Sequence, residues 1–495
     1  MKTNSRSFRI KAGIAAALLF ALSAQAIDFK YAGAGEYDVN VNTNWVGDVA
    51  PNGVDEVANF ALDLQGKQTF YFNEEITLGT LWYGDTYKQT DVQTFYGNRT
   101  GESGGLLVMK VSSGHAKIDK ANGNHAKRTD FYVPIRLDSD TEFGNSNIGG
   151  ALETYFAGEI SGTGSVIKIG AVTRFYWGIN DRTANTYTGS TTVQAGEFHL
   201  NKNGVVSVPG DLIVEGGTAV VDRNNNIGDA GVVTLKNSGG LNFRGYTDTI
   251  GGMESDSDSA WFYGGGSNVT LADDTNRTFA AKLSGTGTIT KQGAGLWTLS
   301  GITDFAGTLN VKGTGGVLID SVASNMTVKV SDGGVLGGSG VVSNQVACTT
   351  GVLAPGSKGT DGTLELAGGI AVSGSVGYTW KLGELSEETG CGKLLLSGGA
   401  SDLRDEVAMT LDFSGLDEAD RPTLGASAGF WRKPHAWTIF DRTGDATCEP
   451  FALTLTNPSG WGSDGRGVFR VTAGTGNSLK LEYTPPHFGL MVIIK

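Results

Sequence analysis

Two adjacent aspartates, Asp273 and Asp274, are the residues whose type and spacing come nearest to catalysis. A pair of carboxyl groups can act as general acid and general base, because glycoside cleavage needs one on either side of the scissile bond. The surrounding segment, Ala-Asp-Asp-Thr-Asn-Arg, is also typical of a solvated turn. It has no Gly-His-Gly or Arg-Ile-Lys companion, and the nearest match is Gly114-His115-Ala116. We therefore expect a turn, and no catalytic residues.

Metal-binding patterns are incomplete. Residues 222–229 have the acidic and amide side chains of an EF-hand loop, but Ile227 stands where the sharp turn requires glycine. The simpler interpretation is an Asn-rich turn before a strand at Val232. Residues 337–340 begin like a calcium-binding nonapeptide, but Val342 replaces its aspartate. The histidines lack ligand spacing and are expected at the surface: His115, His125, His199, His435 and His487. We expect no metal and no cofactor, since nucleotide-binding and nucleophile-elbow motifs are also absent.

Aromatic side chains could stack on sugar rings, or pack in a core and stack between strands, and the second alternative is favoured. The candidates are Trp82, Tyr83, Tyr87, Phe95, Tyr96, Phe175, Tyr176 and Trp177. The cysteines Cys348, Cys391 and Cys448 have no Cys-x-x-Cys spacing. They allow one disulfide but no disulfide framework.

Short strands separated by turns are indicated along the whole chain. Glycine is 76 of 495 residues, about twice the average of roughly 7%, whereas proline is only 10. Proline cannot donate to a strand ladder, and glycine adopts the positive φ of tight turns. Apolar and polar residues alternate over short runs, as in residues 232–236, 326–331 and 409–413. This period of two predicts strands with one buried face. The best helical candidate, residues 382–389, is short and acidic, so little helix is expected.

The first 26 residues have the features of a secretory signal peptide. Lys2, Arg6, Arg9 and Lys11 precede a short apolar run, and Ala24-Gln25-Ala26 forms a cleavage site. The apolar run is too short for a membrane span, which needs about 20 residues. Removing four positive charges and no acids changes the formal net charge from −13 to −17. Such an acidic chain repels phosphate backbones, so nucleic acid is not an expected partner.

An internal repeat gives the clearest evidence on architecture. Residues 156–170 match residues 279–293 at eight of fifteen positions, with a constant offset of 123. Both copies contain Ser-Gly-Thr-Gly-x-x-x-Lys-x-Gly, and both continue into a Gly-centred turn and a strand ending at Val193 or Val311. Self-similarity of this kind indicates a stacked repeat architecture. A recurring module with small residues at its corners suits the stacking of like on like.

These motifs, with Asn185-Thr186-Tyr187-Thr188-Gly189 and the segment 351–357, resemble the autotransporter-associated β-strand repeat of bacterial passenger proteins. The resemblance implies an exported, right-handed parallel β-helix. A tryptophan followed by a Pro-x-x-x-Asp turn, here Trp45 and Pro51 to Asp55, often starts the mature region of such relatives. Residues 27–59 can therefore act as a cap, since an open end of a β-helix exposes unpaired backbone groups.

We accordingly predict an all-β solenoid, a right-handed parallel β-helix with terminal caps. The expected parts are a signal peptide at 1–26, a cap with the first turns at 27–155, a β-helix with passenger-type repeats at 156–377, and a β-rich section with a cap at 378–495. Residues 113–128 are expected to form a surface loop. A β-sandwich is the competing fold, because it too has short alternating strands, but it gives no reason for a sequence to repeat.

The predicted function is that of a non-catalytic bacterial protein at the cell surface, outer membrane or outside the cell, with a structural or adhesive role. The alternative is a carbohydrate-binding or polysaccharide-cleaving β-helix, because a fold alone does not decide function. A conventional autotransporter ends in a translocator barrel, for which this sequence leaves no room, so we expect another secretion route. Expected partners are extracellular polysaccharides or proteins, without a transmembrane span.

The signal-peptide interpretation makes a direct prediction. Exported protein should begin at Ile27, because cleavage follows the small residue of Ala24-Gln25-Ala26. N-terminal sequencing of exported material is the measurement. Exported protein that retains Met1 would contradict the interpretation.

Overall fold

The computed structural model describes most of the chain between residues 25 and 485. The described ranges are 25–85, 92–99, 104–120, 128–144, 153–171, 175–301, 303–356, 362–402, 407–422, 429–444, 446–448, 453–455 and 467–485. The expected signal peptide lies outside these ranges except for Gln25 and Ala26. Tyr87, His125, His487 and the side chain of Cys448 also lie outside them.

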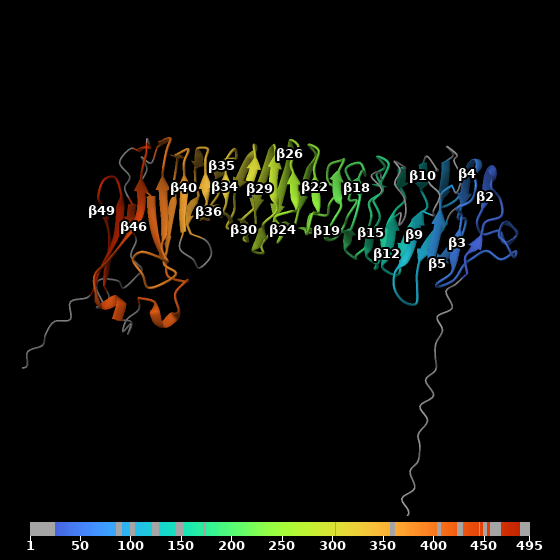
Figure 1. The fold of residues 1–495 in the computed structure, drawn as a ribbon, viewed down its shortest axis with the longest axis horizontal. Helices are drawn as coiled ribbons and strands as arrows, with labels where there is room; N and C mark the ends of the chain where they lie inside the picture. The colour runs from blue at the N-terminus through green and yellow to red at the C-terminus, as the bar shows by residue number, and fades with distance from the viewer. Residues whose placement is uncertain are drawn as a thin grey trace, which may run out of the picture.

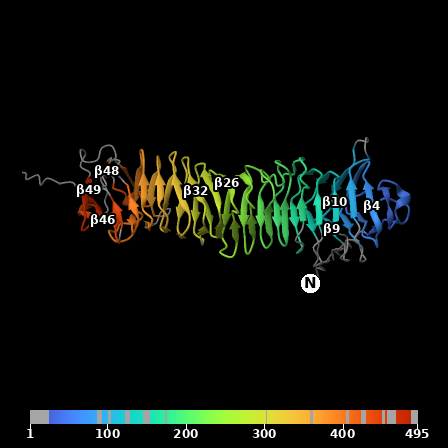
Figure 2. The same cartoon turned by 90° about the horizontal axis from the view of Figure 1, so that it is seen from above.

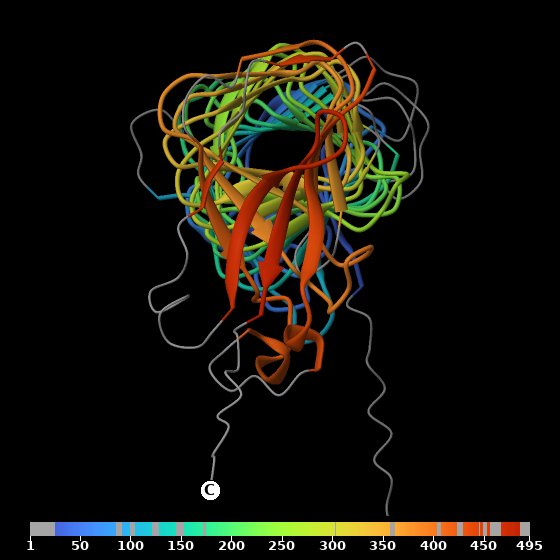
Figure 3. The same cartoon turned by 90° about the vertical axis from the view of Figure 1, so that its left-hand side faces the viewer.

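The chain winds into an elongated parallel β-helix whose two ends hold the first and the last strands (Figures 1 and 2). Successive strands visit three sheets in turn, and each strand pairs in parallel with its equivalent one turn later. Viewed along the long axis, the successive turns overlie one another (Figure 3). Each such turn is called a rung below. The predicted β-helix is confirmed. Among the described strands, antiparallel pairing joins β50 to β46 and β49 at the C-terminal end, and isolated antiparallel bridges occur elsewhere, as between Phe29 and Trp45.

The first sheet contains 18 strands. They are β1 (Ile27–Asp28), β3 (Val57–Asn59), β6 (Thr80–Tyr83), β9 (Ala116–Lys120), β12 (Thr141–Gly144), β15 (Val166–Lys168), β17 (Thr191–Val193), β19 (Leu212–Val214), β21 (Val232–Leu235), β24 (Gly252–Ser255), β27 (Arg277–Phe279), β30 (Leu296–Leu299), β33 (Gly316–Ile319), β36 (Val335–Gly338), β39 (Val352–Pro355), β42 (Gly377–Lys381), β45 (Val407–Asp412) and β48 (Leu453–Leu455).

The second sheet lies next in each rung. Its strands are β2 (Gly33–Asp38), β4 (Gln65–Tyr71), β7 (Val92–Tyr96), β10 (Arg128–Phe131), β13 (Glu153–Phe156), β16 (Phe175–Trp177), β18 (Glu197–Leu200), β20 (Thr218–Val221), β22 (Gly240–Asn242), β25 (Trp261–Tyr263), β28 (Lys282–Gly285), β31 (Thr303–Phe305), β34 (Val322–Ala323), β37 (Val341–Val342), β40 (Gly362–Leu366), β43 (Gly392–Leu396), β46 (His435–Arg442), β49 (Val468–Ala473) and β50 (Leu479–Thr484).

The third sheet is divided into a four-stranded part, a seven-stranded part and a last pair. The first part is β5 (Glu75–Leu78), β8 (Leu106–Met109), β11 (Ile135–Leu137) and β14 (Ile160–Gly162). The second is β23 (Thr247–Ile250), β26 (Ser267–Ala272), β29 (Gly287–Gln292), β32 (Thr308–Val311), β35 (Thr327–Val330), β38 (Val346–Cys348) and β41 (Ile370–Val372). The pair is β44 (Ala400–Ser401) and β47 (Thr447–Cys448).

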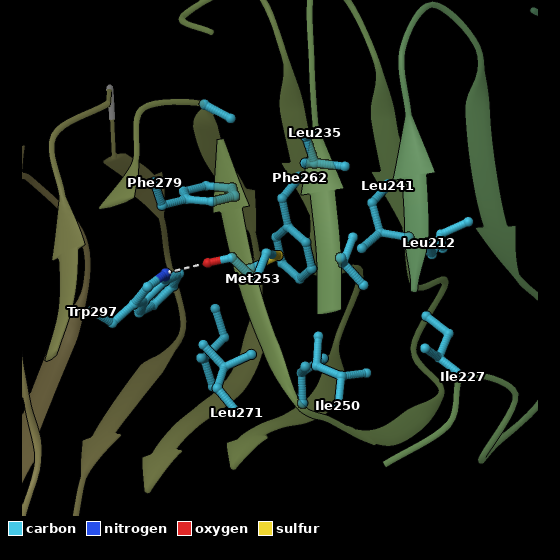
Figure 4. Packing of buried hydrophobic residues seen from close by; sticks show 14 of the residues in the cluster. Leu212, Ile227, Leu235, Leu241, Ile250, Met253, Phe262, Leu271, Phe279 and Trp297 are labelled. Atoms are coloured by element: carbon cyan, nitrogen blue, oxygen red, sulfur yellow. Dashed lines mark hydrogen bonds between the residues drawn. The ribbon is translucent and has the colours of Figure 1, made fainter. Parts of the chain in front are cut away.

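The interior of the coil is filled by one continuous apolar core, built by the predicted alternation. In β35, Val328 and Val330 are buried while Lys329 between them is exposed. The same side of each rung stacks on the next, so Leu309 lies in register with Val328. Figure 4 shows this packing, with the indole of Trp297 donating a hydrogen bond to the Met253 carbonyl oxygen at 2.9 Å.

The N-terminal end of the core is closed by aromatic side chains. Trp45, which follows the 3₁₀ turn η1 (Asn42–Asn44), packs edge-on against Phe29 and Phe60, with ring centroids 5.3 and 5.0 Å apart. Its indole N–H donates to the Val39 carbonyl oxygen at 2.8 Å. The segment pairs antiparallel with residues next to β1, through the bridge between Phe29 and Trp45. The predicted role of Trp45 in covering the first rung agrees with this geometry.

The C-terminal end abandons the parallel pattern. Strand β50 pairs antiparallel with both β46 and β49, so a hairpin-like edge replaces the next parallel rung. Trp431, in the short 3₁₀ turn η3 (Gly429–Arg432), packs against Tyr483 with ring centroids 5.1 Å apart. A change of strand direction stops the addition of further parallel strands, which is one way to protect an edge.

One expected loop proved to contain a strand. Residues 113–128 were predicted as a surface loop, but β9 lies within them, with Ala116 and Ile118 buried. The segment Ala-Lys-Ile-Asp-Lys has the period-two alternation of a strand, which its many polar residues obscure. The predicted scarcity of helix is confirmed for the described residues, whose helices are η1, η2 (Glu418–Asp420) and η3. None of the helices in this part of the chain is long and apolar enough to cross a membrane.

The two copies of the internal repeat lie on different sheets. Residues Ile160–Gly162 of the first copy form β14 in the third sheet, whereas the equivalent Leu283–Gly285 belongs to β28 in the second sheet. The next strands, β15 and β29, are displaced by one sheet in the same way. The expectation that these copies stack like on like is therefore wrong. What repeats is a unit of two strands and their corners, which fits at more than one corner of the coil.

The alternation in β35 predicts opposite effects of the same charge at neighbouring positions. Val328→Asp places an unpaired carboxylate in the core and should lower the free energy of unfolding by about 3 to 5 kcal/mol. Lys329→Asp, which faces solvent, should change it by less than about 0.5 kcal/mol. Urea unfolding of both variants is the measurement. Equal losses in the two variants would show that the register is wrong.

Candidate functional site

The aspartate pair considered for catalysis forms a structural turn. Thr275 N–H donates to the Asp273 carboxylate at 2.8 Å, and Ala294 N–H donates to that of Asp274 at 2.7 Å. Asp273 is 8% exposed and forms an ion pair with Arg277, which also holds Glu254 at 2.7 Å. The predicted turn is confirmed, but Asp273 is not solvated as expected. A carboxylate held in this way by a guanidinium is poorly placed to deliver a proton.

The lysine of the repeated motif is buried in both copies. Lys168 lies in register between Phe143 and Val193, and Lys291 lies between Leu271 and Val311. Both lysines are at most 1% exposed, so their aliphatic stems run inside the coil. The motif thus places a charged residue at an inward position of each copy.

The ammonium groups of these lysines satisfy backbone carbonyls at the corners. Lys168 Nζ donates to the carbonyl oxygens of Ile169, Gly170 and Ala195, each at 2.9 Å. Lys291 Nζ donates to those of Gln292 and Asp273 at 2.7 and 2.9 Å. The donation to the carbonyl of the following residue is common to both copies. The final glycine of each motif, Gly170 or Gly293, turns the corner with a positive φ of 73° or 87°.

A second polar network holds the rungs where the third sheet is interrupted. The Asn185 side chain accepts from Ile160 N–H at 3.0 Å and donates to the Ser207 carbonyl at 2.7 Å. One rung later, the Asn226 side chain bonds both the N–H and the carbonyl of Lys202. The residues 222–229 considered for calcium therefore form the expected Asn-rich turn, built around a buried Asn226.

The next member of this network is a buried carboxyl group. Asp248 accepts from the N–H groups of Asn226 and Ile227 at 2.8 and 3.1 Å. Burial raises the pKa of Asp248 to about 7, against the opposing effect of these hydrogen bonds. Side chains thus add to the backbone hydrogen bonds that remain at this corner, among them those of the parallel bridge between Val208 and Ile227. Within the described parts of the chain no cluster of His, Cys, Asp and Glu could hold a metal ion.

The prediction that histidines lie at the surface is wrong for His199. Its side chain is 4% exposed, with Nδ1 2.7 Å from Asp222 and Nε2 3.2 Å from Glu197. Its ring stacks on Tyr176 with centroids 4.4 Å apart, and Val220 follows it in register. These neighbours bury an outward-pointing residue. Both ring nitrogens face carboxylates, those of Asp222 and Glu197, so the ring is engaged within the coil.

The other described histidines differ from each other. His115 has a side-chain exposed fraction of 43%, as expected for a surface residue. The exposed fraction of the His435 side chain is 8%, because its ring stacks on Phe430 with ring centroids 3.7 Å apart. The prediction that His435 lies at the surface is therefore also wrong.

The cysteine Cys348 is free and buried. Burial raises the pKa of its thiol to about 11, so it is not a reactive thiolate.

Most of the aromatic candidates for sugar binding serve the fold. Core positions are occupied by Tyr83, Phe95, Phe175 and Trp177. On the outer side of the second sheet, Tyr96 stacks on Tyr132 and Tyr176 on Tyr155, with centroids 4.9 and 4.6 Å apart. Rings stacked between rungs have their faces covered. The favoured alternative, core packing and stacking between strands, is thus confirmed for these residues.

Two aromatic residues that the sequence reasoning missed lie over a hollow on the same sheet. Trp261 and Tyr263 project outward from β25, whereas Phe262 between them is buried. The hollow has a volume of about 390 Å³ and continues onto β28 at Lys282 and Ser284. In the sequence, the alternation of residues 260–263 could have indicated that Trp261 and Tyr263 point outward. Gly240, one rung earlier, could have indicated the space beside Trp261.

The buried motif lysine makes a testable prediction about stability and pH. Lys168→Met should lower the free energy of unfolding by about 2 kcal/mol, because three partly buried carbonyl oxygens lose their donor. Burial lowers the pKa of Lys168 to about 8, so between this value and the ordinary one of about 10.4 the unfolded chain binds more protons. The wild-type protein gains stability as pH rises through this window, and the variant lacks that gain.

The measurement is urea unfolding of both proteins at a series of pH values. The stability difference should widen from pH 8 upward, while Lys329→Met, at an exposed position, should show neither effect. A difference that narrows with rising pH would contradict the assignment.

Comparisons with known proteins support a distant relationship. No family model matches the sequence, and no solved structure matches it either. Among curated proteins, the adhesin BmaC autotransporter of Brucella suis biovar 1 (strain 1330) is 29% identical over 190 residues. The aligned region is 38% of this chain but 5% of the adhesin, so the chain spans a small part of that relative's length. The chain is thus a parallel β-helix with distant, partial similarity to an autotransporter adhesin.

Proposed function

We propose that this protein is a non-catalytic, exported β-helix with an adhesive or structural role outside the cell. The observation that carries the proposal is the continuous parallel coil in a chain partly similar to an autotransporter adhesin. Such a coil presents long, regular outer sheets, on which binding groups can be spaced along one axis. The signal-like first 26 residues support export.

The engagement of the charged groups supports a non-catalytic role. Asp273 and Glu254 share the guanidinium of Arg277, and His199 lies between two carboxylates. Catalytic acids and bases must reach a substrate proton, usually at hydrogen-bond distance. Groups that are already saturated by partners within the rungs are better suited to holding the coil together.

The partners that fit this surface are extracellular polysaccharides or proteins. The formal net charge of −13 opposes binding to nucleic acid and to anionic lipid surfaces. The proposed location is the cell surface, the outer membrane or outside the cell, and it is supported by the similarity to the adhesin together with the signal-like start.

A polysaccharide-cleaving enzyme is the second candidate, because carboxylates lie beside a hollow. Glu254 lines a hollow of about 290 Å³ on the first sheet, together with Thr234 and Thr278. Arg277 links Glu254 to Asp273 at its edge. Release of this guanidinium by a substrate would be required before either carboxylate could act, so the non-catalytic proposal is preferred.

Turnover assays separate the two candidates. Purified mature protein should release no reducing or unsaturated ends from a broad panel of polysaccharides, with or without calcium. Immunolabelling of intact cells should place the protein outside the cytoplasm. Turnover that is abolished by Asp273→Ala with Asp274→Ala, but kept by the exposed-site control Asp304→Ala, would establish the enzyme and overturn the proposal.

A further inference from the structure

The hollow over β25 and β28 is lined by four outward side chains. Trp261 lies in register with Lys282, and Tyr263 with Ser284. Alternate residues of a strand are about 6.6 Å apart and neighbouring strands about 4.8 Å apart. The four side chains therefore cover an area close to that of one sugar ring. The loop before β25 adds Asp258 and Ser259 at one margin.

The position of the indole depends on a glycine in the preceding rung. Gly240 lies in register with Trp261, and a Cβ at Gly240 would be 2.1 Å from Cε2 of the indole. Gly240 does not have a positive φ, so its backbone does not require glycine. The absence of a side chain instead leaves room for the indole to lie across β22. The indole thus forms the wall of the hollow on that side.

Several polar groups around the hollow have no partner within the described residues. No hydrogen bond or ion pair is formed there by the indole N–H of Trp261, the hydroxyl of Tyr263 or the ammonium of Lys282. Tyr263 is 44% exposed. The Asp258 carboxylate accepts from Ser259 Oγ at 3.2 Å and keeps further lone pairs. Two aromatic surfaces are therefore combined with free donors and an acceptor.

This combination fits a pyranose ring. A sugar has an apolar C–H face that packs on aromatic rings, and hydroxyl groups that both donate and accept hydrogen bonds. An anionic sugar is disfavoured because Asp256 and Asp258 lie in the adjoining loop and the chain is acidic overall. A protein partner would need an interface of about 1,000 Å² or more, which a hollow for one ring does not supply.

We propose that the hollow formed by Trp261, Tyr263, Lys282 and Asp258 binds a neutral hexopyranose unit of an extracellular polysaccharide. This site deepens the proposed adhesive role by naming the class of ligand. The sugar-binding proposal depends on the proposed adhesive role in one respect, namely that the ligand lies outside the cell. Binding by purified protein can be measured whether or not the chain is exported, so the two proposals fail separately.

The test is calorimetric titration of the mature protein with three neutral hexasaccharides, made of glucose, mannose or N-acetylglucosamine in β-1,4 linkage, and with hexagalacturonate. At least one neutral hexasaccharide should bind, and hexagalacturonate should bind more weakly. Trp261→Ala and Tyr263→Ala should each reduce the affinity by about tenfold or more. Gly240→Ala, which adds only a methyl group beneath the indole, should also weaken binding.

Tyr31→Ala is the matched control, because Tyr31 is likewise 44% exposed but lies at the N-terminal end. It should bind like the wild type. Circular dichroism of each variant checks the fold. The proposal is overturned if no neutral hexasaccharide binds at millimolar concentration, if Trp261→Ala and Gly240→Ala both bind like the wild type, or if hexagalacturonate binds best. Self-association through Trp261 in sedimentation, without sugar binding, would also overturn it.

Discussion

The corners of the coil are the places that the rest of the structure depends on. Along the sheets, each strand satisfies its backbone with the strands one turn before and one turn after it. At a corner the chain changes direction, and some carbonyl groups face the interior without a strand partner. A buried unpaired carbonyl costs about 1 to 3 kcal/mol, so each corner needs a donor. Lys168 and Lys291 supply such donors from inside to the carbonyls of Ile169 and Gln292, and Asn185 and Asn226 supply them where the third sheet is interrupted.

This solution explains why a charged residue recurs in an otherwise apolar interior. A lysine is long enough for its stem to join the core while its ammonium reaches the backbone at the corner. Burying the charge is costly, and the lowered pKa of Lys168, at about 8, reflects that cost. The carbonyls around the ammonium offset part of it. A methionine would pack equally well but leave the carbonyls without donors, which is a physical reason for the lysine in both copies.

The sequence predicted the rungs better than it predicted their corners. Alternation assigned Val328 inward and Lys329 outward, because apolar and polar side chains there agree with the pleat. The same alternation places Lys168 inward, like Val166, whereas its charge predicts an outward side chain. The inward position is possible because the ammonium group donates to carbonyl oxygens at the corner. His199 was misjudged because its burial comes from residues in neighbouring rungs, Tyr176 and Asp222. The sheet on which each repeat copy lies depends on the lengths of the intervening corners, which the motif does not contain. The position of the Trp261 indole depends on Gly240 in the preceding rung, a pairing that the sequence around Trp261 does not contain.

Many polar side chains of this protein form hydrogen bonds or ion pairs with other residues of the coil. Most of the groups that chemistry could employ, including Asp273 and His199, are bound to partners within the coil. What remains available is on the outer sheets, where the hollow at Trp261 combines ring surfaces with free donors. The proposed binding role rests on this outer hollow and on the partial similarity to an autotransporter adhesin.

Amine-reactive labelling of the native protein, read residue by residue by mass spectrometry, tests the central claim that the motif lysines lie inside the coil. Lys168, Lys202 and Lys291 are each at most 1% exposed and hydrogen-bonded to backbone carbonyls, whereas Lys282 and Lys329 are exposed. The account predicts that Lys282 and Lys329 react rapidly in the folded protein, and that the three buried lysines react only after unfolding. Labelling of Lys168 and Lys291 at the rate of Lys329 in the folded protein would contradict it.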